Sequence, residues 1–134
     1  MQNINLLSLI VPAYKQEKTI IKNIKSLDNV LSKLAYKYEI IVVVDGYIDN
    51  TYKNAKKINK KYIKVLGYEK NQGKGHAVKY GMLKSKGDVV GFIDAGMDIS
   101  PAGISILLDS MLWQDADIMI GSKLHPESKV DYPL

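Results

Sequence analysis

Residues 88–101 read DVVGFIDAGMDISP, an apolar run that ends abruptly in two carboxylates, Asp94 and Asp98. A strand buried on both faces of a parallel sheet is expected to be almost continuously apolar, and residues 89–93 fit that pattern. Ligands of open α/β sheets bind just beyond the carboxyl ends of the strands, where Asp94 would lie. Since Mg²⁺ is often held by one or two carboxylates plus substrate phosphates, the segment suits a metal and a nucleotide diphosphate. Alternatively, the two aspartates simply end a strand and precede a helix.

Similar apolar runs alternate with segments of helical period along the whole chain, which predicts an α/β fold with a mostly parallel sheet flanked by helices. The runs expected to form strands are residues 6–11, 39–44, 62–66, 89–93 and 117–120. The segments expected to form helices are residues 20–34, about 51–60, a stretch after Gly75 and about 101–113. We expect the first four strands to lie in the order third, second, first, fourth.

Composition narrows the classes of protein. The 134 residues are 46% hydrophobic and 25% charged, which is typical of one globular domain. The net charge of +5 comes entirely from lysine, and the absence of arginine argues against nucleic-acid recognition, which favours bidentate guanidinium contacts. With no cysteine, any metal must be held by oxygen or histidine. No stretch approaches the roughly 18 apolar residues of a membrane span, and no signal-peptide pattern opens the chain, so we expect a cytoplasmic protein.

Three of the predicted strand ends carry distinctive side chains: Tyr14, Asp45 and Asp94. In the expected strand order they line one crevice at the switch point between the first and fourth strands. There Tyr14 could stack on a base, Asp45 could accept a hydrogen bond from a uracil or guanine ring N–H, and Asp94 could hold a metal on the diphosphate. Each also has a simpler interpretation, because Asp45 with Gly46 is a common turn pair and Tyr14 is one of 9 tyrosines.

The glycine-rich loop 71–77 reads NQGKGHA. A Rossmann fingerprint would need a third glycine where Val78 stands and a place after the first strand, and the loop has neither. Gly73 and Gly75 would allow close backbone approach at a helix amino end, where Lys74 could neutralise a diphosphate. The alternative is a simple turn with a solvated lysine. The lysine-rich stretch 53–64 is likewise either a solvated face or a membrane-facing surface.

Five motifs, in this order and spacing, resemble the family 2 glycosyltransferases with the GT-A fold. They are IVPAYKQEKTI, EIIVVVDGYIDNT, NQGKGHAVKYG, GDVVGFIDAGMD and IMIGSKLHPESKV, and the resemblance covers Leu6 to the last residue. The third motif and the closing GSKLHPESKV are most similar to the branch that makes dolichyl-phosphate sugars, in particular the dolichyl-phosphate glucosyltransferases.

The resemblance implies roles for particular residues. The nucleotide would be bound by Pro12, Ala13, Tyr14, Glu17, Asp45 and Lys74, with Asp45 contacting the base. Mg²⁺ or Mn²⁺ would be held by Asp94, with Asp98 supplying the carboxylate missing at Gly96, where the family usually has a second acid. Sugar or acceptor would meet a loop containing Ser122, Lys123 and His125. Gln16 stands where a glutamate is more usual, which leaves Glu17 as the nearest acid.

The implied reaction is an inverting transfer of a sugar from a nucleotide diphosphate donor to a polyprenyl (dolichyl) phosphate. UDP-glucose is the favoured donor and GDP-mannose the other option. The chain would be one domain over residues 1–134 that lacks the acceptor segment following the last strand in this family, and it would be cytoplasmic, with a peripheral place on the membrane as an option. The alternatives are a non-catalytic nucleotide-sugar-binding module and a nucleotidyltransferase. The latter is disfavoured because PAYKQEKT stands where such enzymes have a glycine-rich basic loop.

Overall fold

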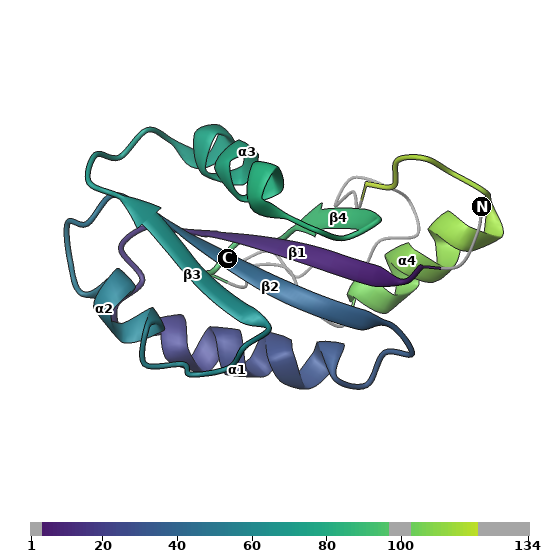
Figure 1. Ribbon diagram of the computed structural model, residues 1–134, viewed down its shortest axis with the longest axis horizontal. Helices are drawn as coiled ribbons and strands as arrows, with labels where there is room; N and C mark the ends of the chain where they lie inside the picture. Colours follow the sequence, from purple (N-terminus) through teal and green to yellow (C-terminus); the bar gives the residue numbers. More distant parts are fainter. Residues whose placement is uncertain (1–3, 97–102, 121–134) are drawn as a thin grey trace, which may run out of the picture. The chain divides into compact units, whose positions relative to one another are not determined.

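A computed structural model describes residues 4–96 and 103–120. Residues 4–96 belong to one compact unit and residues 103–120 to another. A four-stranded, fully parallel sheet forms the centre of the first unit (Figure 1). Its strands are β1 (Leu6–Ala13), β2 (Lys37–Asp45), β3 (Ile63–Tyr68) and β4 (Val89–Phe92), in the order β3-β2-β1-β4. The predicted α/β class and strand order are therefore confirmed.

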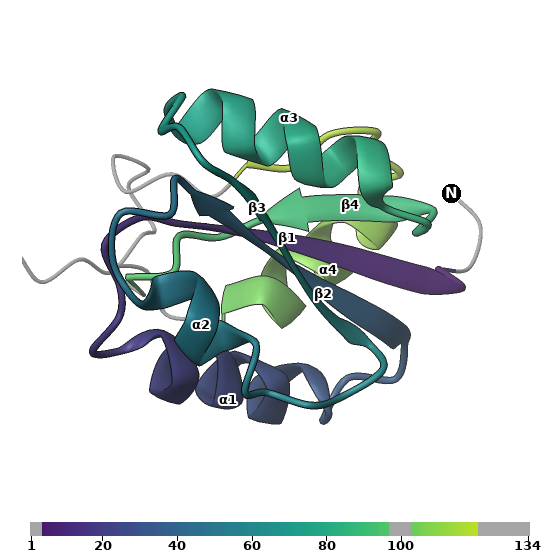
Figure 2. The ribbon, with the colours of Figure 1, turned by 60° about the vertical axis from the view of Figure 1, so that its left-hand side comes forward.

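Helices cover both faces of this sheet. One face carries α1 (Ile20–Leu31) and the short α2 (Thr51–Ala55), and the other carries α3 (Lys74–Lys84), as Figure 2 shows. The apolar positions of α1, spaced by four and three residues, are all fully buried: Ile20, Ile24, Leu27 and Leu31. This is the face that the periodicity predicted. Its burial against the sheet holds α1 in place.

On the opposite face, α3 approaches the sheet closely. Ala77 packs with Ile10, Ile41 and Val43 in a buried core cluster. A Cβ atom placed on Gly81 would lie 2.5 Å from Ile10 Cγ2, so only glycine permits this approach without a shift. Close packing here brings the amino end of α3 to the carboxyl edge of the sheet.

The ends of β1, β2, β3 and α1 lie one to three residues from the predicted ones, and three other predicted elements differ more. First, β4 is not buried on both faces: Val90 and Phe92 are 37% and 52% exposed, because they lie on the α3 face at the sheet edge, opposite Ser8 and Ile10 of β1. Second, α2 ends at Ala55 and not near Lys60, because the chain turns at residues 56–57 and buries the side chain of Ile58.

Third, residues 117–120 form no strand. Apolar, β-branched sequence alone does not make a strand, since a strand requires a partner for its backbone hydrogen bonds. The second unit contains α4 (Gly103–Trp113), which ends where the sequence predicted. Within residues 4–96 and 103–120, no helix has the length and apolar character needed to cross a membrane. The single-domain expectation for residues 1–134 stays a prediction.

Candidate functional site

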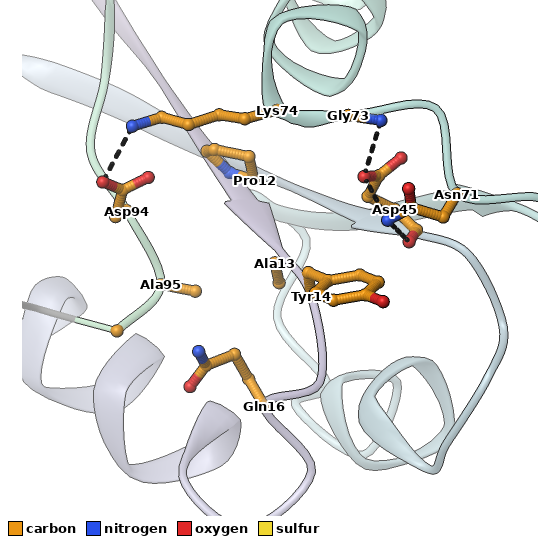
Figure 3. Close-up of a pocket in the computed structure, with 11 residues that line it drawn as sticks. Pro12, Ala13, Tyr14, Gln16, Asp45, Asn71, Gly73, Lys74, Asp94 and Ala95 are labelled. Atoms are coloured by element: carbon orange, nitrogen blue, oxygen red, sulfur yellow. Dashed lines mark hydrogen bonds and ion pairs between the residues drawn. The ribbon is translucent and has the colours of Figure 1, made fainter.

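A pocket of about 320 Å³ lies at the carboxyl ends of β1, β2 and β4 (Figure 3). The structure brings Tyr14, Asp45 and Asp94 together in this pocket, as the predicted strand order requires. The full lining consists of Pro12, Ala13, Tyr14, Gln16, Asp45, Asn71, Gly73, Lys74, Asp94, Ala95 and Gly96. What each of these side chains binds stays a prediction.

The end of β1 forms the floor of the pocket. Ala13 is buried, while Tyr14 is 42% exposed, with Lys15 Nζ 5.3 Å from the centroid of its ring. Backbone hydrogen bonds tie the segment after β4 to the same strand: Ile93 N donates to Ile10 O, and Ala95 N donates to Pro12 O. Asp94 is thereby held opposite the end of β1.

A side chain from α1 completes this anchoring. Asn23 Nδ2 donates to Ala95 O at 2.7 Å and so fixes the backbone next to Asp94. Asn23 was not among the predicted site residues, and a lone asparagine on a helix carries no sequence signal of such a role. Its contribution is visible only when α1 and the end of β4 are seen together.

Lys74 and Asp94 meet across the pocket (Figure 3). Lys74 Nζ lies 2.9 Å from Asp94 Oδ2, and it also lies 5.6 Å from the centroid of the Phe92 ring. The two charged side chains are 55% and 44% exposed. An ion pair this exposed contributes only about 0–1 kcal/mol, so an incoming anion can separate it at little cost.

On the other side of the pocket, Asp45 is buried and accepts four hydrogen bonds. Its Oδ1 accepts from Tyr68 Oη at 2.7 Å and from Gln72 N at 2.8 Å. Its Oδ2 accepts from Asn71 Nδ2 at 2.8 Å and from Gly73 N at 3.0 Å. Asp45 borders the pocket, as predicted, but its carboxylate is bound to the loop that leads into α3.

Glu17, in contrast, lies outside this pocket. Its Oε2 accepts from Asn50 N at 3.0 Å, and its backbone carbonyl accepts from Asn54 Nδ2 at 2.9 Å, so it joins the loop after β1 to the start of α2. Gln16 occupies the pocket instead, positioned by a hydrogen bond from its backbone N–H to Thr51 Oγ1 at 2.8 Å. Glu17 does not line this pocket, and its binding of nucleotide stays a prediction.

Several predicted site residues lie outside the described part of the chain: Asp98, Ser122, Lys123 and His125. Among the residues that the structure does describe, no group of three or more metal-ligating side chains is present. Two carboxylates line the pocket in this part of the chain, and that of Asp45 already accepts four hydrogen bonds. The carboxylate of Asp94 is paired only with the exposed Lys74. One carboxylate plus diphosphate oxygens is sufficient for Mg²⁺ or Mn²⁺, so the residues present fit such an ion.

The sequence motifs resemble those of glycosyltransferases, and the structure places a pocket at their strand ends. Comparison with known proteins identifies the family. The chain belongs to glycosyl transferase family 2, whose profile matches residues 8–132. It is 33% identical over 125 residues to a dolichol-phosphate mannosyltransferase of Pyrococcus furiosus, across 92% of this chain and 35% of that protein. It is 35% identical over 139 residues to a dolichyl-phosphate β-glucosyltransferase of Drosophila melanogaster, across 91% of this chain and 42% of that protein. The chain thus spans less than half the length of these relatives.

Solved structures share the fold. TarS of S. aureus in complex with UDP-GlcNAc is 28% identical, with a TM-score of 0.61 over 81% of this chain and 31% of that one. Glucosyl-3-phosphoglycerate synthase from Mycobacterium tuberculosis, in complex with Mn²⁺, UDP and phosphoglyceric acid, is 26% identical, with a TM-score of 0.63 over 81% of this chain and 39% of that one. The predicted GT-A class is confirmed, and the family is one of enzymes.

Proposed function

We propose that this chain forms the nucleotide-sugar site of an inverting glycosyltransferase that transfers a sugar, glucose as the first choice, to a polyprenyl phosphate. The observation that carries the proposal is the pocket in which Lys74 and Asp94 meet opposite Tyr14, at the carboxyl edge of the sheet. An exposed aromatic ring at one end and a lysine with a carboxylate at the other suit a nucleotide diphosphate, from base to phosphates.

The names of the relatives support the choice of acceptor and leave two donors. Both proteins described above act on dolichol phosphate by name, one as a mannosyltransferase and one as a glucosyltransferase. We favour UDP-glucose because the third and fifth motifs are most similar to the glucosyl branch. GDP-mannose is the competing donor.

In the proposed reaction, a phosphate oxygen of the acceptor attacks the anomeric carbon, and the bond from that carbon to the diphosphate breaks with inversion. The acceptor oxygen is already anionic, so no side chain has to remove a proton. Negative charge develops on the departing diphosphate, and Lys74 lies where it can stabilise that charge. A divalent cation bound with Asp94 would add positive charge at the same place.

The Lys74–Asp94 pair fixes how the two charged groups are arranged before a donor binds. Lys74 neutralises Asp94 before the donor arrives, and the pair is exposed enough to open readily. With a donor bound, Lys74 would pair with the phosphates, and Asp94 would be the residue to hold a divalent cation. Each charged group then keeps a partner of opposite sign.

One observation favours a second candidate, a nucleotide-sugar-binding module without catalysis. Gly96 lines the pocket at the position where the family usually carries a second metal-binding acid. A chain of this kind would bind donor with little dependence on metal and would transfer no sugar. Metal dependence of binding therefore separates the two candidates.

The test is calorimetric titration of the chain with UDP-glucose and with GDP-mannose, each with Mn²⁺ and with chelator. Metal-dependent binding of one donor, lost in Asp94→Ala, supports the transferase site and identifies the nucleotide. Lys74→Met tests whether the lysine contributes to donor binding. Its matched control is Lys79→Met, because Lys79 is an exposed lysine on the same helix that does not line the pocket. Transfer of labelled sugar to dolichyl phosphate then tests catalysis, and failure to bind either donor would contradict the proposal.

We further propose that the chain works in the cytoplasm at a membrane surface, where a polyprenyl phosphate would be anchored. Exposed lysines on and after α2 would favour anionic lipid: Lys53, Lys56, Lys57 and Lys61. Co-sedimentation with anionic vesicles, compared with neutral ones, tests this location. Equal binding to both would contradict an electrostatic attachment.

A further inference from the structure

Asn23 lies in α1 at the border of the buried apolar face of that helix. Ile20 and Ile24, three positions before it and one after it, are fully buried, so the rotation of the helix about its axis is fixed. Asn23 itself is half-buried, and its backbone N–H donates to Thr19 O at 2.9 Å. The packing of α1 against the sheet therefore decides where the Asn23 amide group lies.

The backbone carbonyl of Ala95 accepts a hydrogen bond from that amide group. Ala95 is 2% exposed, and a buried carbonyl needs a hydrogen-bond donor. Asn23 Nδ2 donates to it at 2.7 Å, which is at the short end of the range for an N–H···O bond. The backbone bond from Ala95 N to Pro12 O is long, at 3.3 Å. The side chain of Asn23 is therefore the tighter of these two attachments of Ala95.

The position of Asp94 depends on these attachments, because Asp94 lies two residues beyond the end of β4. On its amino side, Ile93 N donates to the backbone of β1 at 3.0 Å. On its carboxyl side, Ala95 is bonded to both β1 and α1. In Figure 3, the Asp94 side chain extends from this backbone toward Lys74. Backbone contacts on both sides thus direct the carboxylate into the pocket.

A divalent cation in this pocket would require an accurately placed carboxylate. Mg²⁺ demands near-octahedral geometry, with ligands at about 2.0–2.1 Å. The other carboxylate that lines the pocket, that of Asp45, already accepts four hydrogen bonds, so Asp94 is the side chain better able to hold the ion. Groups that orient a metal ligand commonly contribute about 10- to 100-fold to metal affinity.

We propose that Asn23 is a positioning residue for the metal-dependent part of donor binding. It holds the Ala95 carbonyl, and through that backbone it places the Asp94 carboxylate where a cation on the diphosphate can reach it. Asn23 does not line the pocket itself. This inference rests on the proposed function, because it assigns a role within the same donor site. It predicts that loss of the Asn23 amide group weakens binding of the cation and leaves metal-free binding of the nucleotide unchanged.

The experiment measures two affinities: that of Mn²⁺ for the UDP-bound chain, by electron paramagnetic resonance, and that of UDP in chelator, by calorimetry. GDP replaces UDP if the guanine nucleotide is the one that binds. Asn23→Ala removes the amide group, and Asn23→Asp keeps the size of the side chain but replaces the donor nitrogen with an acceptor oxygen. We expect Mn²⁺ affinity to fall about tenfold in each variant. UDP affinity in chelator should equal that of wild type.

The matched control is Asn29→Ala. Asn29 is an exposed asparagine on the same helix, further along α1 and away from the pocket. This variant should change neither affinity. Thermal unfolding of each variant shows whether the compared proteins are folded, and Asn23→Asp provides the comparison if the truncated variant does not fold.

A second comparison tests whether Asn23 acts through Asp94. In the Asp94→Ala background, Asn23→Ala should not weaken UDP binding in Mn²⁺ any further, because the carboxylate that it positions is gone. An undiminished further loss would mean that Asn23 supports the pocket in another way, and it would overturn the proposal.

The remaining outcomes separate this inference from the proposed function. Equal weakening of UDP binding in Mn²⁺ and in chelator, or an unchanged Mn²⁺ affinity, would overturn the positioning role and leave the donor site standing. A wild-type chain that bound UDP equally with Mn²⁺ and with chelator would also overturn it, and would favour the binding module without catalysis. A wild-type chain that bound no nucleotide would overturn the proposed function itself.

Discussion

Two buried aspartates lie at opposite ends of the sheet, and the comparison separates a stabilising cluster from a pocket-forming one. Asp28 lies near the amino ends of β2 and β3, where its carboxylate accepts from Lys60 Nζ at 2.7 Å, from Tyr62 Oη at 3.0 Å and from Tyr38 Oη at 2.5 Å. Asp45 lies at the carboxyl end of β2 and accepts from a tyrosine and three amide groups.

The donors explain the difference in role. Asp28 lies on α1 and has a cationic partner, Lys60. Its donors come from the start of β2 and from the segment just before β3, so the cluster joins α1 to both strands. Burial alone would raise the pKa of Asp28, but the hydrogen bonds from Lys60, Tyr38 and Tyr62 outweigh burial and lower it. Asp45 has only neutral donors. The pKa of one of them, Tyr68, is raised mainly by burial and also by its hydrogen bond to Asp45. The amino end is built for stability, and the carboxyl end shapes a pocket.

The largest expected effect tests the structural half of this comparison. Asp28→Ala removes the carboxylate that Lys60, Tyr38 and Tyr62 share, which should lower the free energy of unfolding by about 2 kcal/mol. Urea denaturation measures this change. UDP affinity of the folded variant should equal that of wild type, and a change in affinity would mean that the two ends of the sheet are coupled.

The next effect tests the functional half. Lys74→Met should weaken UDP binding about tenfold, or about 1.4 kcal/mol, because one charge-assisted hydrogen bond to phosphate is lost. The same variant should lose less than about 1 kcal/mol of stability, since its ion pair with Asp94 is exposed. Calorimetry and urea denaturation give the two numbers, and Lys79→Met should change neither. If Lys74→Met lost more free energy of unfolding than free energy of UDP binding, the carboxyl end of the sheet would also serve stability, contrary to the comparison.

The smallest effect sharpens the comparison through pH. Because the pKa of folded Asp28 is lowered, its stabilisation is complete above its unfolded pKa of about 3.9 and is lost as pH falls through the folded pKa. Asp28→Asn should therefore make stability less dependent on pH on the acid side. Urea midpoints between about pH 5 and pH 2 check this. Some dependence should remain, because hydrogen bonds from the backbone N–H groups of Asn5 and Leu6 also lower the pKa of Asp88. If the urea midpoint of Asp28→Asn depended on pH as that of wild type does, Asp28 would not contribute to the acid dependence of stability.

The sequence predicted the strand order and the meeting of Tyr14, Asp45 and Asp94 at one crevice, because apolar runs and their polar ends follow from local periodicity and from general rules of parallel sheets. The same reasoning predicted a strand at residues 117–120 that the structure does not form, and it did not foresee that Glu17 bonds to Asn50 and Asn54. Both cases concern which partner a group finds, and local pattern does not encode partners far along the chain.

By itself, the sequence determined the α/β class, the family and the set of residues at the strand ends. Only the tertiary structure decided how those residues are used: that Asn23 anchors the backbone beside Asp94, that Lys74 reaches Asp94, and that Asp45 is filled by its own loop. Periodicity is a property of neighbouring residues and can be read along the chain. Hydrogen-bond saturation depends on groups 20 to 72 positions apart, which are brought together only by folding.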